Sequence, residues 1–229
     1  MLGPAPAAEL CDPHCLSSEE MDALLAGAPW RRFVILGDSV AKGLFEQTPG
    51  YGKQNWGERI AAALRRQQPE LSYGNLARPD LRAAEVRETQ LEPALAFRPD
   101  LASVVCGGND LLVPEFDGEA VEDEIEAIVA SLRRQGADVI TFTMFDITRA
   151  LEMPAEFGAQ LSARLGELAD RTQAVAERLD TIHVDLAREP ICADPSIYAS
   201  DYRHGSGRGQ AVCASLTIQR LGEHLANRS

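Results

Sequence analysis

The sequence has no run of about 18 consecutive apolar residues, the length that a membrane-spanning helix requires. Its first nine residues also have neither the basic start nor the apolar stretch of a secretory signal peptide. These two absences lead us to expect a cytoplasmic protein without a membrane span.

Basic residues are scarce. The chain has 22 Lys and Arg residues against 35 Asp and Glu residues, which gives a formal net charge of −13. Proteins that bind nucleic acid phosphates or anionic lipid surfaces rely on basic patches. We therefore expect no nucleic acid partner.

Cysteine is present in an odd number and without a framework pattern. The five cysteines lie at positions 11, 15, 106, 192 and 213, a spacing unlike that of a disulfide-stabilised domain. Cys11, His14 and Cys15 lie close together, but no second Cys and His cluster supplies further ligands at zinc-like spacing. We predict reduced thiols and no metal site.

Alternating strand and helix patterns run through most of the chain. Its 229 residues, 45% of them hydrophobic, are enough to bury one substantial core. Apolar stretches typical of buried strands occur at residues 33–37, 71–76, 101–106, 138–143 and 181–184. The intervening segments are long enough to connect parallel strands. We predict an α/β fold, a three-layer α/β/α sandwich around a five-stranded parallel sheet, with a flavodoxin-like order of elements.

Helical periodicity predicts the helices between these strands. The longest lie at residues 82–95, 120–135, 161–179 and about 210–225. A shorter helix follows Trp56, with Arg59 expected to face outward. Residues 1–31 are expected to form an irregular arm and one short helix, packed on a single domain that comprises residues 32–229.

A serine follows the first predicted strand. The apolar run 33–36 stops at Gly37, and Asp38 and Ser39 come next. In parallel sheets, ligands bind beyond the carboxyl ends of the strands, so Ser39 is either a helix N-cap or a nucleophile. The loops 75–80 and 107–110 are expected at the same edge of the sheet.

A nucleophilic serine needs a base, and a base needs a partner that orients it. Of the four histidines, only His204 lies in a long loop with a carboxylate nearby, Asp201, three residues earlier. That spacing lets Asp201 reach one ring nitrogen while the other points toward Ser39. The alternative is a simple turn in which Asp201 caps its own loop. Asn109 is likewise either an oxyanion donor or a turn residue.

Together these segments resemble the SGNH (GDSL-type) hydrolase family. Gly37-Asp38-Ser39 matches the first block of the family, Gly107-Gly108-Asn109-Asp110 matches its G-x-N-D block, and Asp201-Tyr202-Arg203-His204 matches its D-x-x-H block. The matches occur in the family's order and extend over residues 33–210. The resemblance implies Ser39 as nucleophile, Asp201 and His204 as the rest of a catalytic triad, and Asn109 with the backbone N–H of Ser39 in an oxyanion hole.

The second block departs from the family pattern. Asn75-Leu76-Ala77 matches the Asn-Leu-Ala that often precedes the oxyanion glycine, and this alignment puts Asp80 where glycine is expected. Asp80 is therefore carried over only as a main-chain donor, and the resemblance assigns Asp38, Gly108 and Asn75 to substrate binding.

The resemblance implies a serine hydrolase that cleaves a small carboxylic ester through an acyl-enzyme, as esterases and lipases do, with no metal or organic cofactor. Two alternatives remain open: an acyltransferase that uses the same acyl-enzyme, and a catalytically silent binding module on the same fold. The G-x-S-x-G elbow of α/β-hydrolases and the G-x-x-x-x-G-K-[ST] phosphate loop are both absent from the sequence.

Overall fold

The computed structural model describes residues 7–228, so the first six residues of the predicted arm lie outside the described part. The chain divides into two compact units. Residues 31–42 and 72–195 form the first, which we call the sheet unit. The described residues of the second, which we call the helical unit, are 7–30, 43–71 and 196–228. The single domain expected for residues 32–229 stays a prediction.

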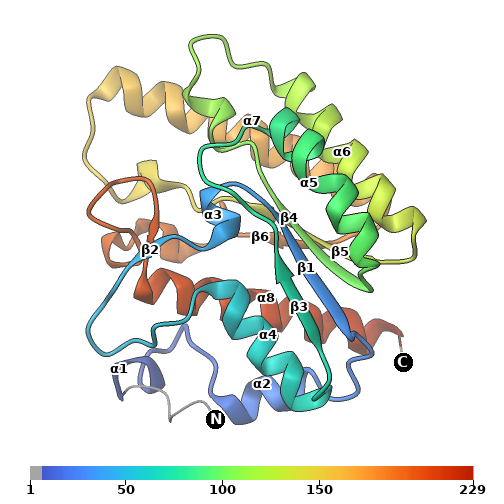
Figure 1. The fold of residues 1–229 in the computed structure, drawn as a ribbon. Helices are drawn as coiled ribbons and strands as arrows, with labels where there is room; N and C mark the ends of the chain where they lie inside the picture. The colour runs from blue at the N-terminus through green and yellow to red at the C-terminus, as the bar shows by residue number, and fades with distance from the viewer. Residues whose placement is uncertain (1–6, 229) are drawn as a thin grey trace. The chain divides into compact units, whose positions relative to one another are not determined.

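The sheet unit is built on a parallel sheet of five strands in the order β3-β1-β4-β5-β6 (Figure 1). The strands are β1 (Arg32–Gly37), β3 (Ser72–Asn75), β4 (Leu101–Val105), β5 (Asp138–Thr143) and β6 (Ile182–Asp185). This is the order of flavodoxin-like proteins. The predicted α/β class and five-stranded parallel sheet are therefore confirmed.

The central strand β1 is apolar on both faces. The four side chains Phe33, Val34, Ile35 and Leu36 are all fully buried. Uninterrupted apolar residues of this kind suit a parallel strand that is covered on both sides. In the register of the sheet, Ile35 lies between Asn75 of β3 and Ser103 of β4.

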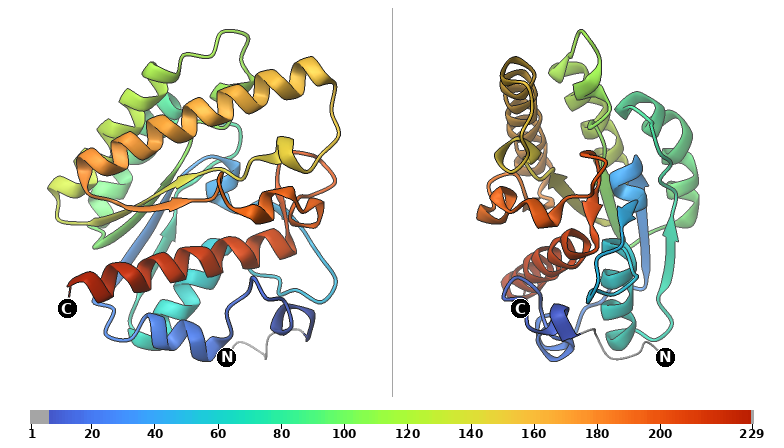
Figure 2. Two further views of the ribbon diagram at one scale, coloured as in Figure 1. Left: turned by 180° about the vertical axis from the view of Figure 1, so that it is seen from behind. Right: turned by 90° about the vertical axis from the view of Figure 1, so that its left-hand side faces the viewer.

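Three helices cover one face of the sheet: α5 (Ala83–Phe97), α6 (Gly118–Arg134) and α7 (Ala155–Leu179) (Figures 1 and 2). The connections from β3 to β4, β4 to β5 and β5 to β6 all advance in the same direction across the sheet. Because such crossovers are right-handed, their helices fall on the same face.

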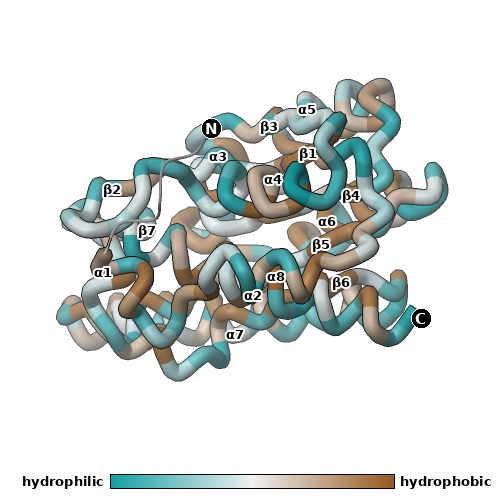
Figure 3. Tube along the Cα trace, turned by 90° about the horizontal axis from the view of Figure 1, so that it is seen from below, coloured by the Kyte–Doolittle hydropathy of each residue, from teal (hydrophilic) through white to brown (hydrophobic). Residues whose placement is uncertain are grey.

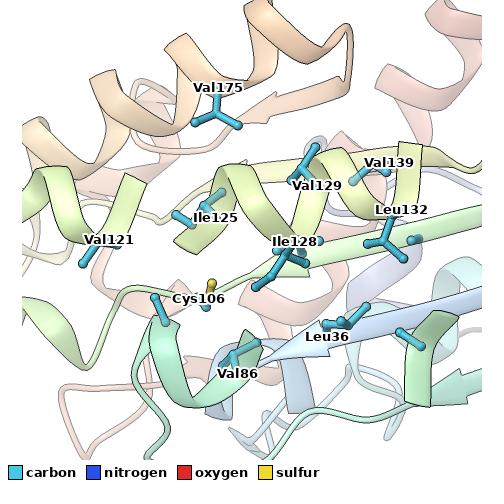
Figure 4. Packing of buried hydrophobic residues seen from close by; sticks show 14 of the residues in the cluster. Leu36, Val86, Cys106, Val121, Ile125, Ile128, Val129, Leu132, Val139 and Val175 are labelled. Carbon is cyan, nitrogen blue, oxygen red and sulfur yellow. The ribbon is translucent and has the colours of Figure 1, made fainter. Parts of the chain in front are cut away.

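An apolar core fills the space between these helices and the sheet (Figure 4). Leu36 of β1, Val86 of α5, Ile128 and Leu132 of α6 and Val175 of α7 are all fully buried in this cluster. The helical spacing that predicted α6 is thus the spacing of its buried face. The side chain of Asp117 caps α6 by accepting a hydrogen bond from the N–H of Ala120.

The start of α7 differs from the sequence prediction. The helix begins at Ala155, whereas apolar periodicity placed its start at Leu161. Residues 155–160 are mostly exposed, so the first turns carry no apolar face that periodicity could detect. Pro154 at the N-cap position marks the boundary instead.

The helical unit contains four helices and a small sheet within its described residues. The helices are α1 (Ala7–Leu10), α2 (Ser18–Leu24), α4 (Trp56–Gln67) and α8 (Gly207–Arg228). Hydrophobic positions are interleaved with hydrophilic ones along α4 and α8 (Figure 3), and α2 and α4 both contact α8. Strands β2 (Phe45–Glu46) and β7 (Gly205–Ser206) pair in parallel.

The outward orientation expected for Arg59 is wrong. Arg59 of α4 is 8% exposed, and its guanidinium pairs with the carboxylate of Glu9 from α1. The second Glu9 oxygen accepts a hydrogen bond from the N–H of Gly52. A buried charge needs such a partner, and here the partner comes from a segment some 50 residues away that periodicity could not identify.

The five cysteines, all of which lie in the described part, form no disulfide. Cys106 is buried at the end of β4, and this burial raises the pKa of its thiol. Within residues 7–228, no helix has both the length and the apolar composition needed to span a membrane. The cytoplasmic location stays a prediction.

Candidate active site

The chain turns sharply at the end of β1. Gly37 has a φ of 143°, and a Cβ atom at this position would lie 1.8 Å from the carbonyl oxygen of Val105 on β4. Only glycine permits such a close approach. The N–H of Asp38 then donates to the same Val105 oxygen at 3.3 Å.

Ser39 begins the single helical turn α3 (Ser39–Lys42) and is 8% exposed. The carboxylate of Asp38 accepts a hydrogen bond from the N–H of Val40 at 2.9 Å, and the Asp38 carbonyl accepts one from the N–H of Lys42. Asp38 therefore shapes the turn that presents Ser39. As predicted from the sequence, the serine follows the carboxyl end of a buried parallel strand.

Asn75, at the end of β3, joins the second block to this turn. Its Nδ2 atom donates to the carbonyl oxygen of Ala41 in α3 at 3.0 Å, and its Oδ1 atom accepts from the N–H of Ala77 at 3.0 Å. The predicted role of Asn75 in substrate binding stays a prediction. Its observed bonds hold the Asn75–Asp80 loop against the turn that contains Ser39.

Asp80 adopts the backbone conformation that glycine favours. Its φ is 63°, in the left-handed region that Asp tolerates better than most residues. Pro79 precedes it, and proline followed by a residue with positive φ is the pattern of a type II turn. The aspartate therefore keeps the loop shape that a glycine would give.

The third block lies beside the first two. A Cβ atom on Gly108 would lie 3.4 Å from the Asp38 carboxylate, and the Nδ2 atom of Asn109 donates to the carbonyl oxygen of Leu81 at 2.9 Å. Asp110 accepts a hydrogen bond from the N–H of Ala83, the first residue of α5. Burial raises the pKa of Asp110 although this bond opposes the shift.

Arg164 of α7 supports the segment after Asn109. Its guanidinium donates to the carbonyl oxygens of Leu111, Val113 and Pro114 at 2.6–2.8 Å. These three bonds hold the chain that leaves the turn η1 (Asp110–Leu112). All three sequence blocks described so far therefore lie at one edge of the sheet unit.

Asp201 and His204 lie in the helical unit and form a close pair. His204 Nδ1 is 2.6 Å from Asp201 Oδ2, and Asp201 Oδ1 accepts from the N–H groups of Arg203 and His204 at 2.9 and 3.0 Å. Although burial disfavours ionisation, the His204 side chain and these N–H groups lower the pKa of Asp201 to about 2. The carboxylate is thus ionised at neutral pH.

The loop that carries this pair is anchored on both sides. Strand β7, directly after His204, pairs with β2, and the Glu46 carboxylate of β2 accepts a hydrogen bond from the N–H of Ser200 at 2.6 Å. This bond lowers the pKa of Glu46. On the other side, Arg208 bonds to the Asp12 carboxylate and to Ser196 Oγ.

Two residues that support the candidate site, Glu46 and Gln90, were not predicted from the sequence. Glu46 lies in a strand of two residues, too short to show any alternation. Gln90 of α5, which is 1% exposed, bonds to both backbone polar groups of Gly37. Its position carries a usable signal, because Gln90 follows Val86 by four residues and precedes Ala94 by four, on the buried face of the helix.

The fold resembles those of several solved hydrolases. A protein described as a GDSL-like lipase from Parabacteroides merdae superposes with a TM-score of 0.69 and 17% identity, over 83% of this chain and 95% of that chain. A lipase/acylhydrolase from Enterococcus faecalis gives 0.67 and 16%, over 85% and 96%. An acetylxylan esterase from Geobacillus stearothermophilus gives 0.67 and 16%, over 86% and 95%. No curated protein sequence matches the chain.

The parallel sheet, with the three sequence blocks at its edge, defines an α/β hydrolytic enzyme of the esterase type. The model of the GDSL-like lipase/acylhydrolase family matches residues 35–212, which is more than half of the chain. The chain belongs to this family, as its sequence blocks predicted, and it is an enzyme of the carboxylic-ester hydrolase class.

Proposed function

We propose that the protein hydrolyses a small carboxylic ester through an acyl-enzyme formed on Ser39, with His204 as general base and Asp201 as the residue that orients it. The contact between His204 Nδ1 and the ionised Asp201 carboxylate carries this proposal. The carboxylate holds a proton on Nδ1, so Nε2 is the nitrogen that can accept a proton from the serine.

The reaction then proceeds in two halves. Ser39 Oγ attacks the ester carbonyl carbon as its proton moves to His204 Nε2, and the carbonyl oxygen becomes an oxyanion. The C–O bond to the alcohol breaks as His204 returns the proton to the leaving oxygen. Water then attacks the acyl-enzyme, gives its proton to His204, and releases the carboxylic acid with Ser39 regenerated.

The developing oxyanion needs donors that are already in place. Asn109 has two hydrogens on Nδ2, and its bond to the Leu81 carbonyl uses only one of them. The other hydrogen is available to the oxyanion. The backbone N–H groups of Ser39 and Asp80 are the proposed further donors, and Asp38 and Gly108 adjoin them in the substrate site.

The acetylxylan esterase that shares this fold offers independent support. Its catalytic mutants replace a serine, an aspartate and a histidine, with the aspartate three residues before the histidine. Asp201 and His204 have the same spacing.

Labelling with a fluorophosphonate, followed by peptide mass spectrometry, tests the nucleophile. We expect a covalent adduct on Ser39 in the wild type and none in Ser39→Ala. We also expect hydrolysis of p-nitrophenyl acetate to fall at least about 10³-fold in Ser39→Ala and in His204→Ala. Ser131→Ala is the matched control, because Ser131 Oγ bonds to the Ala127 carbonyl and to Arg134, both of which lie in α6.

Two results would contradict this function. An unlabelled wild type that is folded would favour a silent binding module. Turnover that rises several-fold with added alcohol, together with ester product from that alcohol, would make the enzyme an acyltransferase.

A further inference from the structure

The residue that precedes the proposed nucleophile turn, Gly37, has both of its backbone polar groups held by a side chain. Gln90 Oε1 accepts a hydrogen bond from the N–H of Gly37 at 2.8 Å, and Gln90 Nε2 donates to the carbonyl oxygen of Gly37 at 2.8 Å. One side-chain amide thus satisfies both backbone groups of a single residue. Gln90 lies on α5, 53 residues farther along the chain.

These bonds occur where the neighbouring strand has ended. Strand β3 pairs with β1 only as far as Asn75, opposite Ile35, two residues short of Gly37. Beyond that point, Leu76 N–H donates to the Ile35 carbonyl and Arg78 N–H donates to the Gly37 carbonyl at 3.2 Å. The N–H of Gly37 therefore donates to Gln90 Oε1 and not to a strand carbonyl.

The other edge of the turn is held by the sheet itself. The N–H of Asp38 donates to the Val105 carbonyl of β4. The residues just before Ser39 are therefore fixed from both sides, by backbone on the β4 side and by the Gln90 amide together with the Arg78 N–H on the β3 side. Because Gln90 is only 1% exposed, water cannot replace its amide without opening the core.

We propose that Gln90 is a positioning residue for catalysis, whose side-chain amide replaces the missing strand acceptor for the Gly37 N–H, braces the Gly37 carbonyl, and so fixes the orientation of Gly37 and hence of Ser39. This inference rests on the proposed role of Ser39 as nucleophile. A small displacement of a nucleophile from its productive geometry lowers the rate of the chemical step, while the affinity for substrate changes little.

The test compares Gln90→Met, Gln90→Glu and Val86→Ala with the wild type, using p-nitrophenyl acetate. Gln90→Met keeps the size of the side chain and removes both hydrogen bonds, so we expect kcat to fall about 10- to 100-fold with KM changed less than about threefold. Val86→Ala, one turn earlier on the same buried face, is the control for a loss of stability that removes no hydrogen bond.

Gln90→Glu gives a signature that stability alone cannot imitate. A protonated carboxyl has one acceptor and one O–H donor, the same pattern as an amide, whereas the ionised form has no donor and repels the Gly37 carbonyl. We expect the ratio of kcat in Gln90→Glu to wild-type kcat to approach one as the pH falls, and to decrease as the pH rises. In Gln90→Met the same ratio should not depend on pH.

The nearby charges that are shielded from solvent raise the pKa of the introduced carboxyl. Asp38, next to Gly37, and Asp110, which caps the first turn of α5, both oppose a further negative charge. Arg78, on the adjoining loop, has an exposed side chain, as do Arg87 and Glu88 on α5. The pKa of the introduced carboxyl should therefore lie above the ordinary range of a Glu side chain.

The possible results separate the two proposals. A kcat of Gln90→Met within about twofold of the wild type, while Ser39→Ala is inactive, would overturn the role of Gln90 and leave the nucleophile intact. Equal losses of kcat in Gln90→Met and Val86→Ala at equal melting temperatures would overturn it as well. Full turnover in Ser39→Ala would instead overturn the proposed function, and the positioning role with it.

Discussion

Asp201 holds His204 by both its ring and its backbone. One carboxylate oxygen lies 2.6 Å from His204 Nδ1, and the other accepts the His204 N–H at 3.0 Å. A single side chain thus fixes the histidine's main chain and the direction of its imidazole. The three-residue spacing predicted from the sequence is what allows both contacts.

Replacing this carboxylate should disable the histidine without disturbing the loop. In Asp201→Asn, an amide N–H facing Nδ1 would favour the tautomer with its proton on Nε2, which cannot accept the serine proton. We expect kcat for p-nitrophenyl acetate to fall roughly 10³- to 10⁴-fold. Asp117→Asn is the matched control, since Asn caps helices as well as Asp does and activity should be unchanged. An Asp201→Asn enzyme with more than a tenth of wild-type kcat would contradict the assignment.

Asn109, which lies in the sheet unit, provides a second test. Asn109→Asp keeps the size of the side chain but removes both Nδ2 hydrogens and brings a charged oxygen toward the Leu81 carbonyl. Loss of one oxyanion donor typically lowers kcat by about 10²- to 10³-fold, and we expect a loss of at least this size with steady-state assays. The rate of fluorophosphonate labelling should fall with it. Unchanged kcat would assign Asn109 to the turn alone.

Asp80 occupies a position that suits glycine. Asp80→Gly should leave kcat/KM unchanged or raise it several-fold, because glycine adopts a φ of 63° without strain and brings no carboxylate near the oxyanion. Asp80→Val should lower both stability and kcat, because a β-branched residue is strained in this conformation. Thermal melting and steady-state kinetics check both. Higher activity in the valine variant than in the glycine variant would contradict the requirement for a positive φ at this position.

Gly37 should tolerate no larger residue. In Gly37→Ala the Cβ atom would lie 1.8 Å from the Val105 carbonyl oxygen, so β1 and β4 would have to separate. We expect destabilisation by more than about 3 kcal/mol, measured by urea unfolding. Gly136→Ala is a suitable comparison, because Gly136 also has positive φ, at 90°, but an added Cβ meets no atom within 4 Å. That variant should lose only about 1–2 kcal/mol.

Asp12 should make the stability of the protein depend on pH. Burial disfavours its charge, but hydrogen bonds from Arg208, the His14 N–H and Tyr51 lower the pKa to about 2. Because this folded-state pKa lies below the ordinary Asp value of 3.8, the stabilisation is complete above about pH 4 and disappears as the pH falls through about 2. The lowered pKa of Asp12 therefore contributes roughly 2 kcal/mol to the free energy of unfolding at neutral pH.

We therefore expect Asp12→Asn to reduce the free energy of unfolding by about that amount at pH 7, and the gap from the wild type to close toward pH 2. Urea unfolding at several pH values measures it. Asp22→Asn, at an exposed pair with Arg66, should change stability by less than about 0.5 kcal/mol at any pH. A gap for Asp12→Asn that is constant with pH would contradict the linkage.

Local pattern was enough to predict most of the sheet unit. Strand β5 was predicted with its observed bounds, and β1 and β6 within a residue, because a parallel strand buried on both faces is a continuous apolar run. The three blocks at the sheet edge followed from the strand ends. Helix starts such as that of α7 were less accurate, since exposed first turns carry no apolar period.

What the sequence could not predict are bonds between distant segments. The pairing of β2 with β7 joins Phe45 to Gly205 through only two residues on each side, which leaves no alternation to detect. Likewise, a polar residue such as Gln90 on a buried helix face signals that it has a partner but does not identify Gly37 as that partner. Tertiary partners of single side chains require coordinates.

The pairing of β2 with β7 also dictates when a growing polypeptide acquires its histidine site. Glu46 is synthesised early, yet its acceptor role and the two-residue ladder wait for Ser200, Gly205 and Ser206, more than 150 residues later. A polypeptide that ends before Ser200 therefore lacks both contacts that anchor the loop of Asp201 and His204 to β2.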